Sequence, residues 1–299
     1  MPFAQPYRGR FAPSPTGLLH AGSLTTAVGS YLQARTQGGE WLLRMEDLDP
    51  PREMPGASAA ILRTLETLGF AWDGPVVYQS QRLDAYQQAL DHLVAQQRAY
   101  PCACTRREIA LAGQAGLDGV VYPGTCRAGL PAGRTGRAWR LRVPVGLTHV
   151  VDGLHGLIEQ DVLACVGDYV LKRADGLFAY QLAVVVDDAW QGVNAVVRGA
   201  DLLDSTTRQI VLQQALGVAT PSYVHLPVLV NAAGEKLSKQ TLAPAIRPDA
   251  AAAELRLALT RLGHPPPADC GGLAELWAWA LAHWQVSRVS AAPVVVREG

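Results

Sequence analysis

The stretch RFAPSPTGLLHAGS, residues 10–23, contains the succession of local patterns that decides the fold. The residues that lead into it, from about Tyr7 to Ala12, have the character of a short strand. Pro13 to Gly17 are expected to form a turn, because the two prolines fix φ and the glycine lets the backbone reverse. From Leu18 to Arg35, apolar residues recur at the 3.6-residue period of a helix. The stretch therefore predicts a strand, a turn and a helix in direct succession.

The rest of the chain repeats this alternation and predicts an α/β fold with a largely parallel sheet. Between about Tyr100 and Arg137 the composition changes to cysteines, glycines and arginines without a sustained period, which indicates an inserted subdomain. We expect strands at residues 40–50, 177–190, 195–203 and 225–230, and helices at residues 57–70, 80–97 and 206–217 and after Pro248.

Composition and charge limit the classes of protein to which the chain can belong. With 49% hydrophobic and 17% charged residues over 299 positions, it has the composition of a folded, core-forming protein. Its 26 basic and 26 acidic residues balance, which argues against strong nonspecific binding to nucleic acid. No secretion signal and no apolar run of about 18 residues is evident, so we expect a cytoplasmic protein with no membrane segment.

The first turn is a candidate phosphate site of an uncommon type. The chain contains neither the dipeptide Gly-Lys nor any Gly-x-Gly, so both the P-loop and the dinucleotide fingerprint are absent. His20 and Ser23, three residues apart in the first helical turn, face the same way and could bind a phosphate chain at the helix N-terminus. The alternative is that His20 caps the helix or packs against it, and the residues alone favour that alternative.

Lysine is rare in this chain, and its placement is informative. Only three of the 26 basic residues are lysines, and two of them, Lys236 and Lys239, lie in the four-residue string KLSK. Such a pair suggests a site that needs a compact, mobile ammonium group rather than a planar guanidinium. Two solvated lysines in a loop are the alternative.

Three of the five cysteines are spaced as metal ligands. Cys102 and Cys104 are one residue apart, and Cys126 follows after a glycine-containing loop. This spacing suits a structural zinc ion in a segment too short to bury a core of its own, although three cysteines leave one ligand position open. From the spacing alone, three buried thiols are an equally good interpretation.

Several segments together resemble the glutamyl branch of class I aminoacyl-tRNA synthetases. RFAPSPTGLLHAGS and KLSKQ resemble the two ATP-binding signatures of the class. The glutamyl enzymes usually have a second histidine where this chain has Ser23. Only 59 residues follow Gln240, where those enzymes continue into an anticodon-binding domain. Both departures resemble the shortened paralogues called glutamyl-Q tRNA(Asp) synthetases. The matching segments, in order, are RFAPSPTG, LLRMEDLDP, AYQLAVVVDD, VVRGADLL and HLPVLVNAAGEKLSK.

The resemblance implies an architecture and a reaction. The expected architecture is a Rossmann-like catalytic domain over residues 1–245, interrupted at about 100–177 by a zinc-binding insertion, and a helical region at 246–299 without an anticodon-binding domain. The expected reaction is ATP-dependent activation of L-glutamate, with Mg²⁺ and without tRNA, followed by transfer of glutamate to queuosine at the anticodon wobble position of tRNA(Asp). A monomer that binds the anticodon stem-loop is expected.

The resemblance also assigns roles to individual positions. Catalytic roles fall on His20, Ser23, Lys236 and Lys239, and His20 and Lys239 are expected to bind ATP. Asp47, Asp49, Asp187 and Asp188 receive no role, and we expect them to act as structural caps. The positions expected to contact glutamate are Arg10, Phe11, Ala12, Pro13, Ser14, Glu46, Tyr180 and Arg198, and those expected to hold one zinc ion are Cys102, Cys104, Tyr122 and Cys126.

Two alternative functions are compatible with the same residues. One is a truncated glutamyl-tRNA synthetase that charges a tRNA 3′ end. The other is a non-catalytic paralogue that binds glutamate or RNA, against which the intact His20, Lys236 and Lys239 argue.

Overall fold

The opening stretch folds as a strand, a turn and a helix, as predicted. The computed structural model describes residues 6–117, 119–237 and 246–296 of the chain. Strand β1 (Arg8–Phe11) is followed by a turn and by helix α1 (Ala21–Thr36). Leu24 and Val28 on α1 have no exposed surface, so this helix lies inside the molecule.

The parallel strands form two adjacent sheets. In the first, β1 pairs with β2 and β2 with β3, all in parallel. In the second, the order is β11, β12, β8 and β9, and only the β8–β9 pair is antiparallel. The two sheets meet where Asn194, just before β11, donates its backbone N–H to the carbonyl oxygen of Arg8 at 3.1 Å. The strand bounds are β2 (Glu40–Met45), β3 (Val77–Tyr78), β8 (Thr148–Asp152), β9 (Gly156–Gln160), β11 (Ala195–Gly199) and β12 (Ser222–Leu226).

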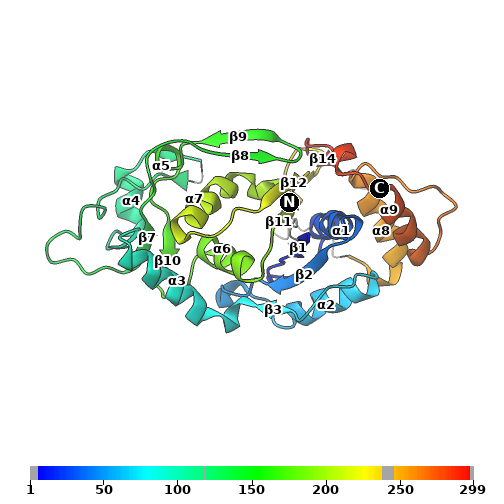
Figure 1. Cartoon of the computed structure of the whole chain (residues 1–299), viewed down its shortest axis with the longest axis horizontal. Helices are drawn as coiled ribbons and strands as arrows, with labels where there is room; N and C mark the ends of the chain where they lie inside the picture. Colours follow the sequence, from blue (N-terminus) through cyan, green and yellow to red (C-terminus); the bar gives the residue numbers. More distant parts are fainter. Residues whose placement is uncertain (1–5, 118, 238–245, 297–299) are drawn as a thin grey trace.

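Two groups of helices cover these strands, as Figure 1 shows. The C-terminal helices α8 and α9 contact α1 and lie at one end of the molecule, near α2. Helices α3, α6 and α7 pack on one another around a second apolar cluster. The helix bounds are α2 (Ala57–Thr67), α3 (Leu83–Ala95), α6 (Tyr180–Trp190), α7 (Thr206–Leu216), α8 (Ala251–Arg261) and α9 (Leu273–His283).

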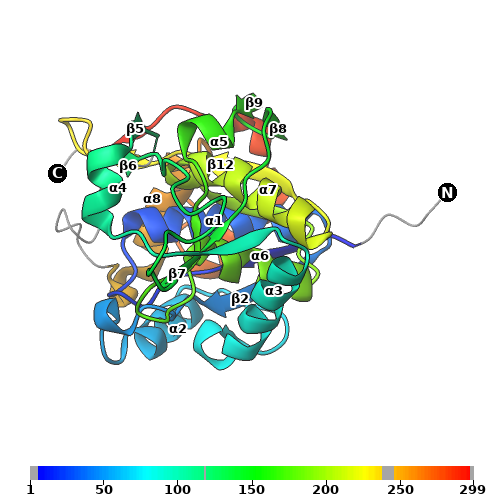
Figure 2. The same ribbon diagram turned by 90° about the vertical axis from the view of Figure 1, so that its left-hand side faces the viewer.

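The segment with the cysteines lies at the opposite end from α8 and α9 (Figures 1 and 2). Its strands β4, β7 and β10 make an antiparallel sheet, and β5 and β6 make a short hairpin. The bounds are β4 (Ala99–Cys102), α4 (Arg106–Ala112), β5 (Ala115–Gly116), β6 (Gly119–Val120), β7 (Ala138–Leu141), α5 (Val162–Cys165) and β10 (Val170–Lys172). A last pair, β13 (Leu229–Val230) with β14 (Val294–Val295), joins the C-terminal region to the residues after β12.

The expectation of a buried strand at residues 177–190 is wrong, because Tyr180–Trp190 form helix α6. The run LAVVVDDAW is rich in valine, which favours strands, but a short apolar run does not distinguish a buried strand from a buried helix. Leu182, Ala183, Val184 and Val185 are all buried, so no polar face marks the helical period. The strand expected at residues 195–203 is confirmed as β11, which ends at Gly199.

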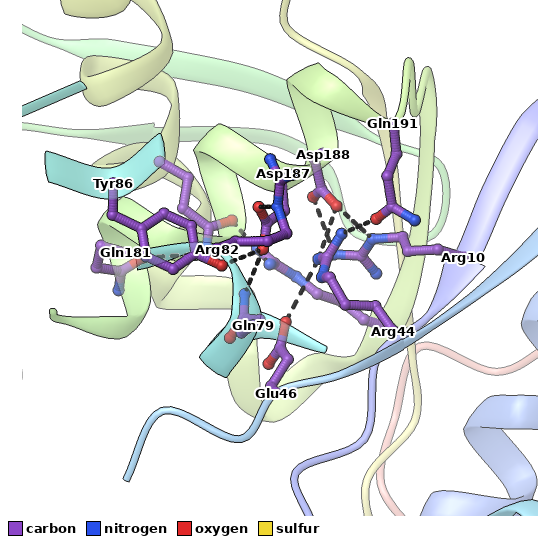
Figure 3. Close-up of polar contacts among 12 residues, drawn as sticks. Arg10, Arg44, Glu46, Gln79, Arg82, Tyr86, Gln181, Asp187, Asp188 and Gln191 are labelled. Carbon is purple, nitrogen blue, oxygen red and sulfur yellow. Dashed lines mark hydrogen bonds and ion pairs between the residues drawn. The ribbon is translucent and has the colours of Figure 1, made fainter. Parts of the chain in front are cut away.

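A buried carboxylate joins α6 to α3 (Figure 3). Asp187 on α6 has no exposed surface and accepts hydrogen bonds from the Tyr86 hydroxyl at 2.7 Å, from Arg82 Nε at 2.6 Å and from Gln79 Nε2 at 2.9 Å. All three donors lie on α3 or just before it. Asp187 is therefore not the cap that was expected, because its carboxylate joins α6 to α3 through polar contacts.

Replacing this carboxylate should destabilise the fold strongly. We expect Asp187→Ala to lower the free energy of unfolding by about 3–5 kcal/mol, because it leaves a largely buried guanidinium without its partner. Asp175→Ala is the matched control: Asp175 is half exposed and pairs with Arg173 at 2.6 Å, so its loss should cost less than about 1 kcal/mol. Urea unfolding of both variants measures the difference, and equal losses would contradict the role given to Asp187.

Candidate active site

A cavity of about 820 Å³ opens at the carboxyl ends of β1 and β11. Ligands bind at this edge in open α/β sheets. Of the residues that the sequence assigned to catalysis and substrate binding, only Lys239 is not placed, because it lies outside the described residues. All the others line this one cavity: Arg10, Phe11, Ala12, Pro13, Ser14, His20, Ser23, Glu46, Tyr180, Arg198 and Lys236.

The first turn of α1 presents His20 and Ser23 to the cavity. His20 is the N-cap residue, and its Nδ1 accepts from the backbone N–H of Ser23 at 3.4 Å. The Ser23 hydroxyl lies 3.0 Å from His20 Nε2. A Cβ atom at Gly22 would lie 3.1 Å from the His20 ring, so the glycine leaves room for the histidine. His20 is thus a helix cap that also lines the cavity, so the capping interpretation is confirmed and phosphate binding stays a prediction.

A buried ion-pair network joins Arg10, which lines the cavity, to Asp188 and Arg44 (Figure 3). Arg10 Nε and Nη2 each donate to the Asp188 carboxylate, at 3.1 and 3.2 Å. Arg44, which has no exposed surface, lies 2.8 Å from the same carboxylate and donates to Gln191 Oε1 at 2.6 Å. Although burial alone would raise it, the two guanidinium groups hold the pKa of Asp188 below its ordinary value.

Glu46 and Tyr180 form another wall of the cavity. Glu46 Oε1 lies 3.4 Å from Arg44 Nη2, and its backbone N–H donates to the carbonyl of Pro13 at 3.0 Å. Burial raises the pKa of Glu46, and the charges of Arg44 and Arg10 oppose that rise. Burial raises the pKa of the Tyr180 phenol most, and the nearby Glu46 carboxylate raises it further. Tyr180 is therefore a neutral hydroxyl beside an acidic group.

Arg198, at the end of β11, is held in a different way from Arg10. Its Nε donates to His225 Nε2 at 3.0 Å, its Nη1 to Gln209 Oε1 at 2.8 Å and its Nη2 to Thr206 Oγ1 at 2.9 Å. Within residues 6–117, 119–237 and 246–296, no ion pair joins Arg198 to a carboxylate. The cavity therefore contains a guanidinium whose orienting side-chain partners are uncharged.

Lys236 lies at the rim of the cavity, close to the end of β11. Its Nζ forms an ion pair with Asp201 Oδ2 at 2.6 Å, and the side chains are 48% and 36% exposed. An exposed pair of this kind contributes little to stability, so it can exchange for another anion at small cost.

The four acidic residues without an assigned role behave differently from one another. Asp47 caps the turn at Ser80 as expected, since its Oδ1 accepts from the Ser80 N–H at 2.9 Å. Asp49 makes no side-chain cap bond to the described residues that follow it, contrary to the expectation, and instead pairs with Arg52 at 2.6 Å. Asp187 and Asp188 are not caps, because their carboxylates are bound by buried side chains from α3, β1 and β2.

The cysteine cluster has the dimensions of a tetrahedral metal site. The Sγ atoms of Cys102, Cys104 and Cys126 all lie within 4.8 Å of one another, and those of Cys104 and Cys126 are 3.6 Å apart. The Tyr122 hydroxyl lies 3.4 Å from Cys102 Sγ and 3.7 Å from Cys104 Sγ. Zinc–sulfur bonds of about 2.3 Å in a tetrahedron separate two sulfur atoms by about 3.8 Å. The residues present therefore fit a bound zinc ion.

The sequence did not identify three residues that orient the site. Arg44 on β2 is two positions before Glu46, which directly follows the strand, so the two-residue period of a strand could have indicated it. His225 and Asp152 contact each other at 2.7 Å but are 73 positions apart, and no local pattern links them.

Comparison with known proteins identifies the family. The family described as class I tRNA synthetases (E and Q), catalytic domain, matches residues 7–262. The glutamyl-Q tRNA(Asp) synthetase of Chromobacterium violaceum is 67% identical over 288 residues, which are 96% of this chain and 97% of that protein. The protein of the same name from Dechloromonas aromatica is 63% identical over 95% of this chain and 96% of its own length.

Among solved structures, the fold is similar to that of a glutamate tRNA ligase from Elizabethkingia meningosepticum. The TM-score is 0.80 at 24% identity, and the match covers 97% of this chain and 67% of that one. At this identity the likeness concerns the fold alone, and it confirms an α/β fold of the class I synthetase type. The chain belongs to the glutamyl-Q tRNA(Asp) synthetase family, a family of ligases within the class I tRNA synthetases.

Proposed function

We propose that this enzyme activates L-glutamate with ATP and transfers it to queuosine in the anticodon of tRNA(Asp). The observation that carries the proposal is that residues of two kinds line one and the same cavity. Arg10, Arg198 and Glu46 are predicted to contact the amino acid, and His20 and Lys236 belong to the two ATP-binding signatures. The names of the similar proteins, glutamyl-Q tRNA(Asp) synthetases, support the same substrate class.

Arg198 is proposed to bind the γ-carboxylate of glutamate, with Arg10 beside it. A guanidinium whose side-chain partners are uncharged, as those of Arg198 are among the described residues, gains most from an anionic ligand in a buried cavity. Glutamine would present NH₂ donors to guanidinium donors, so discrimination against it should be large. Glu46 is proposed to accept the substrate ammonium, and Tyr180 and Ser14 to bind its remaining polar atoms.

His20, Ser23 and Lys239 are proposed to act on ATP. The α-carboxylate of glutamate attacks the α-phosphorus, the bond to the β-phosphate oxygen breaks, and pyrophosphate leaves. ATP would bind as its magnesium complex. Negative charge develops on the phosphate oxygens in the transition state, so positioned cations and hydrogen-bond donors lower the barrier. His20 and Ser23 at the N-terminus of α1 would hold the nucleotide, while Lys239, with Lys236, would hold the departing phosphates.

In the second step a cyclopentene hydroxyl of queuosine would attack the carbonyl carbon of the adenylate, and AMP would leave. The RNA partner proposed is the anticodon stem-loop of tRNA(Asp). Within the described residues no helix has the length and apolar character needed to cross a bilayer. The division into residues 1–245 with an insertion at about 100–177 and residues 246–299, the monomeric state and the cytoplasmic location remain predictions.

One structural zinc ion is proposed for the cluster of Cys102, Cys104, Tyr122 and Cys126, which fits its bond lengths. Three thiolates and a tyrosine oxygen would close the coordination sphere, as in structural sites. Metal binding would stabilise a small group of residues whose apolar core is limited to the cluster and a few neighbours.

The order of the steps and the site of transfer test the function directly. We expect glutamate-dependent exchange of pyrophosphate into ATP without RNA, and transfer of labelled glutamate to queuosine-containing tRNA(Asp). Nuclease digestion should locate the label at the wobble nucleotide. Label at the terminal adenosine would support a truncated charging enzyme instead, and no exchange at saturating glutamate would support a binding protein. Unmodified tRNA(Asp), which lacks the queuosine diol, is the control and should accept no label.

The lysine of the second signature should act in the chemical step. We expect Lys239→Ala to reduce the exchange rate by roughly 10²-fold or more while the affinity for glutamate changes little, because a contact of the transition state is lost. Lys172→Ala is the matched control, since Lys172 donates to Gln87 Oε1 away from the cavity and should be dispensable for exchange. An active Lys239→Ala enzyme would remove this lysine from the proposal.

The metal proposal is tested by composition as well as by stability. Purified protein should contain about one zinc ion per chain by atomic emission, and Cys104→Ser should lose it. Cys165→Ser, which alters a cysteine outside the cluster, should keep the metal. Wild-type protein that is folded but free of metal would contradict the zinc site.

A further inference from the structure

A chain of three side chains leads from the proposed carboxylate-binding arginine to a buried acid. Arg198 on β11 is the register partner of His225 on β12, and β12 lies between β11 and β8. Arg198 Nε donates to His225 Nε2 at 3.0 Å, and His225 Nδ1 lies 2.7 Å from Asp152 Oδ2. All three side chains are at least 95% buried, so water does not replace these contacts.

Only one form of the His225 ring satisfies this chain. A guanidinium nitrogen can donate but cannot accept, so His225 Nε2 must be the unprotonated nitrogen. The proton then lies on Nδ1 and is donated to the Asp152 carboxylate. The other neutral tautomer, and the imidazolium, would direct an N–H at the N–H of Arg198. The Thr206 hydroxyl, 3.1 Å from His225 Nε2, can donate to the unprotonated nitrogen, so it is compatible with the Nδ1–H form.

Asp152 is itself fixed by the backbone around it. Its Oδ1 accepts from the N–H groups of Leu154 and His155, at 2.9 and 3.0 Å, which leaves Oδ2 for the histidine. Although burial opposes it, these bonds and the bond from His225 lower the pKa of Asp152 to about 2. A carboxylate with both oxygens bound in this way has one orientation.

We propose that His225 is a positioning residue for glutamate binding, which aims the Arg198 guanidinium through its neutral Nδ1–H tautomer, with Asp152 as the residue that selects this tautomer. The inference rests on the proposed function, in which Arg198 binds the γ-carboxylate. Because the imidazole separates the acid from the arginine, Arg198 is oriented without being neutralised by direct contact. Its charge stays available to the substrate.

Asp152→Asn tests the selection of the tautomer. The asparagine amide can keep the backbone bonds through its oxygen and then presents an N–H to His225 Nδ1, which favours the tautomer that opposes Arg198. We expect KM for glutamate to rise roughly 10- to 100-fold, with little change in KM for ATP. Asp161→Asn is the matched control, because Asp161 caps α5 through Oδ1 and asparagine caps equally well.

Spectroscopy separates a tautomer effect from a general loss of structure. Among the seven histidines, the ring ¹⁵N signals that disappear in His225→Gln belong to His225. In wild-type protein they should have the shifts of the Nδ1–H form, and in Asp152→Asn those of the Nε2–H form. Wild-type shifts of the Nε2–H form, or an Asp152→Asn protein with unchanged KM for glutamate, would overturn the proposal.

A second variant keeps the test decisive if Asp152→Asn does not fold. The Oε1 atom of His225→Gln can replace Nε2 as an acceptor for Arg198, whereas His225→Leu cannot. We expect KM for glutamate to rise at least tenfold more in His225→Leu than in His225→Gln. Equal values in two folded variants would overturn the positioning role. Wild-type enzyme without glutamate-dependent exchange would instead refute the proposed function itself.

Discussion

The site depends on the contacts of the buried Asp188 carboxylate with two arginines. This carboxylate lies between the guanidinium groups of Arg10 and Arg44, so that α6 is joined to the first two parallel strands, and Arg10 is 178 positions away in the sequence. Burying two arginines without this acid would leave uncompensated charge, at a cost of about 3–5 kcal/mol. The same contact fixes the direction of Arg10 and, through Arg44, supports Glu46 at the cavity wall.

The two arginines that line the cavity are stabilised by opposite means. Arg10 and Arg44 share the Asp188 carboxylate, and this acid compensates the charge of Arg10. Arg198 is surrounded instead by an imidazole, an amide and a hydroxyl. Uncharged partners orient a cation and leave its field in place, which suits a site for an anion. The Asp188 network thus supplies rigidity, and the surroundings of Arg198 supply the electrostatic attraction.

The sequence predicted those parts whose signals are local. The first strand, turn and helix follow from prolines, a glycine and a helical period within 30 residues, and the cysteine cluster follows from its spacing. The sequence of helix α6 predicts a strand, wrongly, because its apolar run has no polar face. The partners of Asp188, and the link from Asp152 to His225, depend on which strands become neighbours, and that information is not local.

Strand β8 connects residues 100–177 to the strand that holds His225, the partner of Arg198. It lies inside the range 100–177 expected for the insertion, yet it pairs with β12 in parallel, where Asp152 is the register partner of Tyr223. His155, just after β8, lies 3.0 Å from the carbonyl oxygen of His225. A displacement of this strand would therefore move the groups that orient Arg198. Residues from the range expected for the insertion therefore contribute to the position of Arg198 through the sheet.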